Sequence, residues 1–168
     1  MIISEQVFNN TISLNPNDLN KDINNITLLK LKKQYEGLCK DDCYILKNSI
    51  VIFKRSMGRI ETYDNVSVVK YDIMYKCSII SPKKNEEIEC IVSNKNKMGI
   101  IAYIKIDDKY NSYDNDLDNS PLIIILPNDM INGININDIN IKQKIKIKVL
   151  ATRIKYRNEK IQIVGTII

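Results

Sequence analysis

The chain of 168 residues contains no histidine and no tryptophan, and only five glycines and four prolines. Histidine is the usual general base near neutral pH, so its absence removes the commonest acid–base chemistry. The glycines never cluster, which excludes a glycine-rich phosphate loop. No catalytic set can be named, and we expect a protein that is not an enzyme and that needs no cofactor.

Long apolar runs are also missing. The longest lies between Pro121 and Pro127, far short of a membrane span. The first residues show no basic segment followed by an apolar one, so we expect no signal peptide. We expect an intracellular protein in a reducing compartment, with no membrane partner.

Cysteine is sparse, at positions 39, 43, 77 and 90. Without histidine, a mixed Cys/His zinc site is impossible, and the spacing of Cys39 and Cys43 fits neither a zinc ribbon nor a thioredoxin motif. An all-cysteine site would need all four thiols together, although two of them fall on expected strands. We therefore favour buried, reduced thiols and no metal.

What the chain does have is asparagine, isoleucine and lysine in excess, with a formal net charge of +5. These residues have AT-rich codons, which indicates an AT-rich genome such as that of a large DNA virus or a protist. The mild positive charge is compatible with nucleic-acid contact without requiring it.

The first half predicts one helix on strands. Asn15-Pro16-Asn17-Asp18 has the capping residue, the first-turn proline and the acidic residue of a helix start. Gly37 is a plausible stop, so we predict a helix over 16–36. Its apolar positions recur at helical spacing: Leu19, Ile23, Ile26, Leu28, Leu31 and Tyr35.

Strands follow that helix. Residues 69–79 alternate apolar and polar side chains at period two, as in a half-buried strand, and 44–53 holds two apolar clusters around a turn. Ser81-Pro82-Lys83-Lys84-Asn85 breaks the pattern. We place a domain boundary there, between 1–84 and 85–168.

The second half contains only strands, with a turn at 94–97 and a polar loop at 107–120. The expected strands are Glu87–Ser93, Met98–Ile106, Leu122–Leu126, Ile139–Ile154 and Ile161–Ile167. Such a set fits a small Greek-key barrel of the OB type. The fold class is therefore α+β: one helix on an antiparallel sheet, followed by an all-β OB-fold barrel.

Several motifs occur in a fixed order: Ile12-Ser13-Leu14-Asn15-Pro16, Tyr35-Glu36-Gly37-Leu38-Cys39, Gly58-Arg59-Ile60, Val69-Lys70-Tyr71, Glu87 to Val92 continuing to Gly99, and Ile163-Val164-Gly165-Thr166-Ile167. In that order and spacing, over nearly its whole length, the chain resembles the stalk subunit that archaeal RNA polymerase shares with eukaryotic RNA polymerase II, where it is the seventh subunit. It departs from the family at Cys90, where glycine is usual.

The resemblance implies a non-catalytic subunit of a DNA-directed RNA polymerase, with an N-terminal tip domain that docks on the core. The implied docking loop wedges between the clamp of the largest subunit and a small neighbouring subunit. It comprises Arg55, Met57, Gly58, Arg59 and Ile60. The alternative is an ordinary hairpin in which Gly58 supplies a turn conformation.

The resemblance also implies a helical partner subunit, packed where the two domains meet, with the helix and the Val66–Ile80 strand as candidate contacts. It implies that nascent RNA passes the barrel. The expected location is the nucleus, or a cytoplasmic viral factory and the virion if the source is viral.

The RNA-contact candidates are basic residues and one tyrosine: Lys97, Tyr103, Lys142, Lys144, Lys146, Lys148, Arg153 and Lys155. The four lysines from Lys142 to Lys148 alternate with apolar residues, so they form either a phosphate-contacting stripe or a solubilising, edge-protecting face. The expected stacking face (Ile100, Tyr103, Ile123 and Ile125) has one aromatic residue. RNA contact should therefore be weak, non-specific and electrostatic.

Two alternatives remain open. The acidic 107–118 loop lacks the spacing of an EF-hand, which favours a solvated loop, lying away from RNA, over a cation site. The barrel would also suit a free-standing RNA-binding factor in translation or RNA decay.

Overall fold

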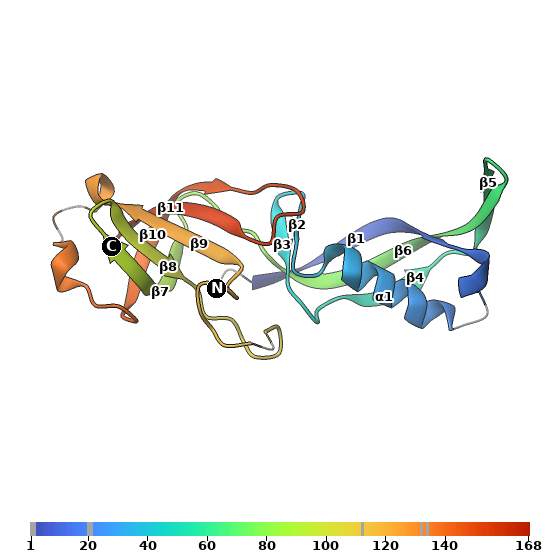
Figure 1. The fold of residues 1–168 in the computed structure, drawn as a ribbon, viewed down its shortest axis with the longest axis horizontal. Coiled ribbons are helices and arrows are strands. Elements are labelled where there is room, and N and C mark those ends of the chain that lie inside the picture. Colours follow the sequence, from blue (N-terminus) through green and yellow to red (C-terminus); the bar gives the residue numbers. More distant parts are fainter. Residues whose placement is uncertain (1–2, 20–21, 112, 132, 134) are drawn as a thin grey trace.

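A computed structural model describes residues 3–19, 22–111, 113–131, 133 and 135–168. Figure 1 shows an elongated molecule, with a sheet and one helix at one end and a barrel at the other. The sheet contains β1 (Ile3–Leu14), β2 (Cys39–Lys40), β3 (Cys43–Ile45), β4 (Val51–Arg55), β5 (Arg59–Tyr63) and β6 (Val66–Ile80).

The sheet is organised around β6, a strand of 15 residues. All of β1 pairs with it in antiparallel register, while β3, β4 and β5 follow one another along its other side. Tyr71, Ile73, Tyr75 and Cys77 are buried, and the residues between them are more exposed up to Lys76. The predicted alternation over 69–79 is confirmed as far as Cys77, after which both faces of the strand are covered.

The helix is shorter than predicted. A 3-10 turn covers Pro16–Asp18, and α1 covers Ile23–Tyr35. The carboxylate of Asp22 caps α1, because it accepts hydrogen bonds from the backbone N–H groups of the second and third residues after it, at 3.1 and 3.4 Å. The expectation that Asn15 starts the main helix is therefore wrong, since Asn15 begins only the 3-10 turn. Gly37, with φ +76°, follows the helix end as expected.

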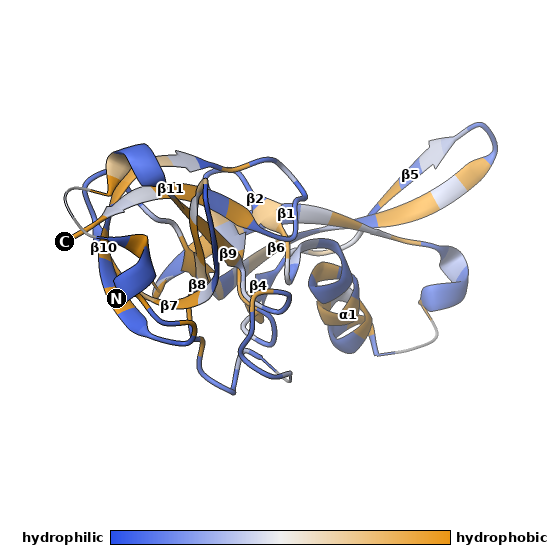
Figure 2. Cartoon of the chain, turned by 60° about the vertical axis from the view of Figure 1, so that its left-hand side comes forward, coloured by the Kyte–Doolittle hydropathy of each residue, from blue (hydrophilic) through white to orange (hydrophobic). Residues whose placement is uncertain are grey.

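One apolar face of α1 packs on the sheet. Leu31 is fully buried there, among core residues that include Ile12, Ile45 and Tyr75. Figure 2 shows α1, with both apolar and polar colours on its turns, lying beside the strands of the sheet. No helix of the described residues is long and apolar enough to cross a membrane.

The second half closes into a barrel of β7 (Glu87–Asn96), β8 (Gly99–Tyr103), β9 (Leu122–Pro127), β10 (Lys144–Arg153) and β11 (Ile161–Ile167). The strand order around the barrel is β7-β8-β9-β11-β10 and back to β7. Only the β9–β11 pairing is parallel. This Greek-key order is that of an OB-like barrel, so the predicted closed five-stranded barrel is confirmed.

Several strand ends differ from the prediction, and β8 ends at Tyr103 and not at Ile106. The turn between β7 and β8 lies at Lys97 and Met98, because Asn94 to Asn96 still pair with β8. β10 starts at Lys144 and not at Ile139. Ile139 is nonetheless buried in the barrel core, so its apolar character reflects closure of the barrel end and not strand pairing.

The apolar core of the barrel continues into the sheet. Cys39, Tyr44, Leu46 and Ile80 belong to the same buried cluster as the barrel interior. The predicted boundary near residue 84 falls between sheet and barrel along the chain, but the buried core does not stop there. We call this shared region the seam.

Hydrogen bonds reinforce the seam. The N–H of Cys39 donates to the carbonyl of Asn158 at 2.7 Å, and the N–H of Arg157 donates to the carbonyl of Cys39 at 2.8 Å. The hydroxyls of Ser78 and Tyr110 lie 2.9 Å apart. Since β2 thereby bonds to the β10–β11 connection, the sheet and the barrel are joined by main-chain pairing as well as by apolar packing.

Gly99, at the start of β8, has φ +147°, and a Cβ there would lie 2.1 Å from the carbonyl oxygen of Leu126. We predict that Gly99→Ala lowers the free energy of unfolding by more than about 3 kcal/mol, because strand pairing must shift. Gly133→Ala is the control, since a Cβ there meets nothing within 4 Å and carries only the φ +71° strain, about 1–2 kcal/mol. Equal losses in urea unfolding would contradict this account.

Candidate docking hairpin and basic barrel surface

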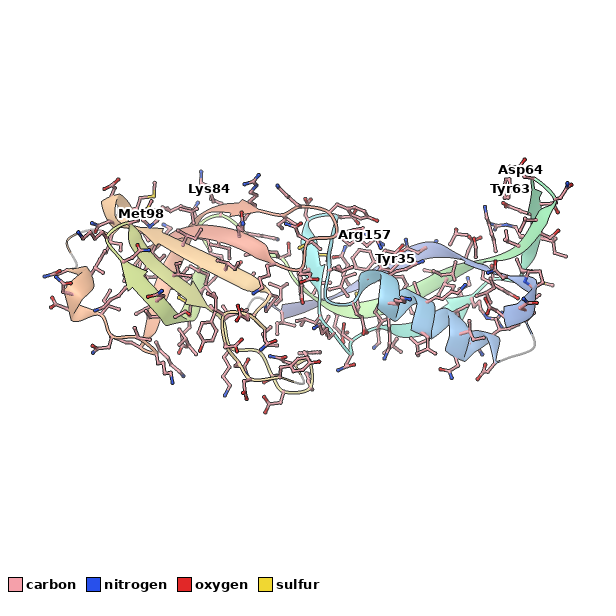
Figure 3. All side chains as sticks on the ribbon, in the orientation of Figure 1. Tyr35, Tyr63, Asp64, Lys84, Met98 and Arg157 are labelled. Carbon is pink, nitrogen blue, oxygen red and sulfur yellow. The ribbon has the colours of Figure 1, made fainter. Side chains whose placement is uncertain are left out.

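The β5–β6 hairpin projects beyond the rest of the sheet (Figure 1). Tyr63 pairs with Val66, and the two residues between them, Asp64 and Asn65, have φ +45° and +66°. Two left-handed residues form the tight turn that matches the twist of a hairpin. Tyr63 and Asp64 mark its far end in Figure 3.

Apolar side chains on and beside the hairpin face solvent. Met57 is 90% exposed and Ile60 is 76% exposed, and Tyr63 and Val66 are also exposed. Single exposed apolar residues are ordinary, but a group on one projecting element is typical of an interaction surface.

Ion pairs occupy one face of the hairpin. Arg59 pairs with Asp72, and Lys70 pairs with Glu61 at 2.6 Å. The hydrogen bond from Arg59 is the main cause that lowers the pKa of Asp72. Arg59, a predicted docking residue, is therefore already engaged within the hairpin, whereas Ile60 points to the opposite face of its strand.

The connection before the hairpin is closely packed. Gly58 does not have positive φ, and a Cβ there would lie 2.7 Å from Val69 and 3.0 Å from the Tyr71 ring. The alternative that Gly58 supplies a turn conformation with positive φ is therefore wrong; its small size lets the connection between β4 and β5 pass close to the Val69 and Tyr71 side chains of β6. Arg55 donates to the Asn24 side chain at 2.9 Å and lies over the Tyr71 ring.

A groove of about 490 Å³ lies between α1 and β4. Its lining includes Leu28 of α1 and Val51, Phe53 and Arg55 of β4. Val51 and Phe53 are exposed.

The predicted lysine row on the barrel is only partly formed. Lys144, Lys146 and Lys148 lie on β10, where the residues between them are buried, as the alternation predicts. Lys142 precedes the strand in a turn with φ +68°, so its assignment to this row is wrong. The remaining lysines face β7, the neighbouring strand.

Carboxylates of β7 offset the positive charge of this lysine row. Lys146 contacts Glu87 at 2.6 Å, and Lys144 contacts Glu89 at 3.5 Å. The hydrogen bond from Lys146 is the main cause that lowers the pKa of Glu87. Two of the three lysines are therefore neutralised by β7, which weakens the field that a phosphate would meet.

The other basic candidates are dispersed. Arg153 ends β10 and Lys155 follows it, in the connection that borders the seam, while Lys97 lies in the β7–β8 turn. In Figure 3, Met98 beside that turn lies at the barrel end away from the sheet, and Arg157 lies near the sheet. The structure therefore does not gather these residues into one patch.

The outer face of β8 and β9 is aliphatic. Ile100 is fully buried inside the barrel, so its prediction as a surface residue is wrong by one position in register. Ile101 points outward instead and lies opposite Ile125. With Ile123 and Tyr103 partly exposed, the face offers one aromatic ring for stacking on bases.

Lys40 was not expected to be special, yet its side chain is buried, with 9% of its surface exposed. Its Nζ lies 4.4 Å from the centre of the Phe8 ring and 4.8 Å from that of Tyr35, and it donates to the Asn10 side chain at 2.6 Å. Burial is the main cause that lowers its pKa. This cation–π cage ties β2 to β1 beside the seam.

The remaining reactive groups are the cysteines and the carboxylates of the acidic loop. All four cysteines are free and buried, and burial is the main cause that raises the pKa of each thiol to about 11 or 12. Within the described part of the chain no group of three or more metal-binding side chains forms a site. In the acidic loop, Asp116 accepts hydrogen bonds from both the backbone and the side chain of Asn119.

No protein-family model matches the chain, and no curated protein matches it. The surface features available for binding are the exposed side chains of Met57, just before the hairpin, and Ile60, on the hairpin, and the partly neutralised lysine row on β10.

The buried thiol of Cys90 predicts a pH dependence of stability. Its pKa is raised by burial to about 12, from an ordinary 9.0, so the unfolded chain loses this proton first as pH rises. Unfolding free energy should fall between those two values, by up to about 1.4 kcal/mol per pH unit for this thiol. In Cys90→Ala the decline, followed by circular dichroism in urea under reducing conditions, should be correspondingly shallower. An unchanged slope would show that Cys90 does not contribute.

The ion pairs on the barrel predict that removing their carboxylates strengthens RNA binding. Glu87→Gln with Glu89→Gln should free Lys146 and Lys144 and so raise the affinity for single-stranded RNA. The affinity should also fall more steeply as salt rises, by the equivalent of about one to two additional phosphate contacts. Fluorescence anisotropy over a salt series measures both quantities.

The matched control is Asp42→Asn with Asp64→Asn, which raises the net charge equally but lies outside the barrel. If both double variants bind RNA with the same affinity, the gain comes from net charge and the row on β10 has no special role.

Proposed function

We propose that this chain is a non-catalytic stalk subunit of a multisubunit DNA-dependent RNA polymerase. The main support for this proposal is that a hairpin with exposed apolar side chains lies at one end of the molecule and an OB-like barrel at the other (Figure 1). In this proposal the hairpin docks on the polymerase core near the clamp of the largest subunit and a small neighbouring subunit. The barrel then faces the emerging transcript.

The docking role rests on Met57 and Ile60, because their exposed side chains gain most from burial. Complete burial of such side chains is worth roughly 1.5–3 kcal/mol each. Arg59 supports the hairpin through Asp72 and does not contact the core directly. Arg55, held by α1 and Tyr71, fixes the base of the hairpin.

A helical partner subunit has an available surface. α1 covers one face of the sheet, while Val7, Lys76 and Val51 lie in register across β1, β6 and β4 and are exposed on the other face. An amphipathic helix with an acidic residue opposite Lys76 would suit this row. The partner would then pack along β6 near the seam.

RNA contact by the barrel is weak and independent of sequence in this proposal. The outer face of β8 and β9 offers only the partly exposed ring of Tyr103 for stacking, and carboxylates neutralise part of the lysine row. The remaining attraction is electrostatic, so it should weaken as salt rises. The protein acts wherever the polymerase does, in a nucleus or, for a viral enzyme, in a cytoplasmic factory and the virion.

A free-standing RNA-binding factor in translation or RNA decay is the second candidate, and the barrel alone favours it. Such a factor would have no use for exposed apolar residues on the distant hairpin. Docking of the hairpin therefore separates the two candidates.

We predict that Met57→Asp with Ile60→Asp reduces recovery of the largest polymerase subunits with the tagged chain by at least about tenfold, because two docking side chains become charged. Quantitative mass spectrometry of the purified assembly measures the recovery. These substitutions test docking more directly than charge reversal of Arg59, because that reversal would also break the ion pair between Arg59 and Asp72.

Met98→Asp is the matched control, since Met98 is 83% exposed but lies in a barrel turn. It should leave the recovery unchanged. If no polymerase subunit is recovered with the wild-type chain, the proposal fails; if the hairpin variant and the control behave alike, the hairpin is not the docking element.

A further inference from the structure

β1 has an open edge. Its 12 residues pair with β6 from Ile3–Ile80 to Leu14–Val69 without a bulge. On its other side, no backbone group in the described ranges bonds to it. In Figure 1 no segment runs alongside that side of β1. A strand edge of this length is a template for a further strand.

The other edges of the sheet are protected and β1 is not. β4 has a bulge between Ile52 and Lys54, and it ends in two basic residues. β5 is short, and its Arg59 and Glu61 side chains form ion pairs. β1 contains no lysine, arginine or proline, and its one charged residue is Glu5. Charge, bulges and proline are the usual devices against edge pairing.

The direction of the open groups can be deduced. The Lys30 ammonium donates to the carbonyl of Ser13 at 3.0 Å, so that carbonyl points away from β6. In an antiparallel pair the backbone groups of alternate residues point the same way. The unbonded N–H and C=O groups of β1 therefore belong to the odd-numbered residues, from Glu5 to Thr11.

We propose that a second copy of this chain adds to this edge, with the two β1 strands antiparallel about a twofold axis at Asn9. Asn9 then lies opposite Asn9 of the second copy, Val7 opposite Thr11, and Glu5 opposite Ser13. Every pair joins two odd-numbered residues, so open groups meet open groups on both strands. The two sheets become one continuous sheet with closed symmetry.

Charge and burial favour a second copy as the occupant. In this register Glu5 reaches the Ser13 end of the other strand, where the Lys30 ammonium, which also pairs with Asp18 at 3.4 Å, is held at the edge. The two Glu5–Lys30 attractions are related by the twofold axis, and no like charges face each other along β1. Val7, which is exposed in the single chain, becomes partly covered.

Sedimentation velocity of the purified chain over a concentration series tests this proposal without any polymerase, so its outcome is independent of the proposed function. The wild-type chain should dimerise. Asn9→Lys places two ammonium groups together at the axis and should raise the dimer dissociation constant at least about tenfold. Asn9→Gln is the control and should dimerise like the wild type, with circular dichroism confirming that both variants fold.

Hydrogen exchange locates the contact. The outward amides of Val7, Asn9 and Thr11 should exchange more slowly at high protein concentration than at low concentration. A wild-type chain that stays monomeric at the highest soluble concentration overturns the proposal. So does a dimer that Asn9→Lys leaves intact, because another surface then joins the copies.

Discussion

The seam is the constraint on which the rest of the structure depends. Tyr44 of β3, Leu46 directly after β3 and Ile80 of β6 pack into the barrel core, and the main chain of Cys39 bonds to the β10–β11 connection. Each of these apolar side chains contributes roughly 1.5–3 kcal/mol when fully buried. Because packing and main-chain pairing act at the same place, the sheet cannot turn against the barrel without exposing the barrel core.

This coupling gives the proposed function its geometry. The hairpin and the far end of the barrel lie at opposite ends of the molecule (Figure 3), so fixing the hairpin on a large partner fixes where the barrel points. Lys40 strengthens the arrangement next to the seam, since its buried ammonium holds β2 against Phe8 and Asn10. In the proposed function, the fold serves to fix the position of the barrel relative to the hairpin.

The sequence predicted what depends on local periodicity. The barrel strands and the alternation along β6 were accessible because one buried face repeats every second residue. Features that depend on how the barrel closes could not be predicted from this periodicity. Ile139 is apolar because it closes the barrel end, and the Ile100 side chain points inward because the turn lies at Lys97 and Met98. Nothing in the sequence marks Lys40 as buried, because the Phe8 and Tyr75 rings of its aromatic cage are distant from it along the chain. The docking roles of the hairpin remain predictions.

Native-state hydrogen exchange of the intact chain in increasing urea tests the seam most directly. If the seam joins the two halves, the best-protected amides of β6 and β9 should open with the same free energy, within about 1 kcal/mol, because both report global unfolding. Amides of one half that remain protected by about 3 kcal/mol more than those of the other would show that the halves unfold independently. That result would contradict the account, since the hairpin could then no longer fix the direction of the barrel.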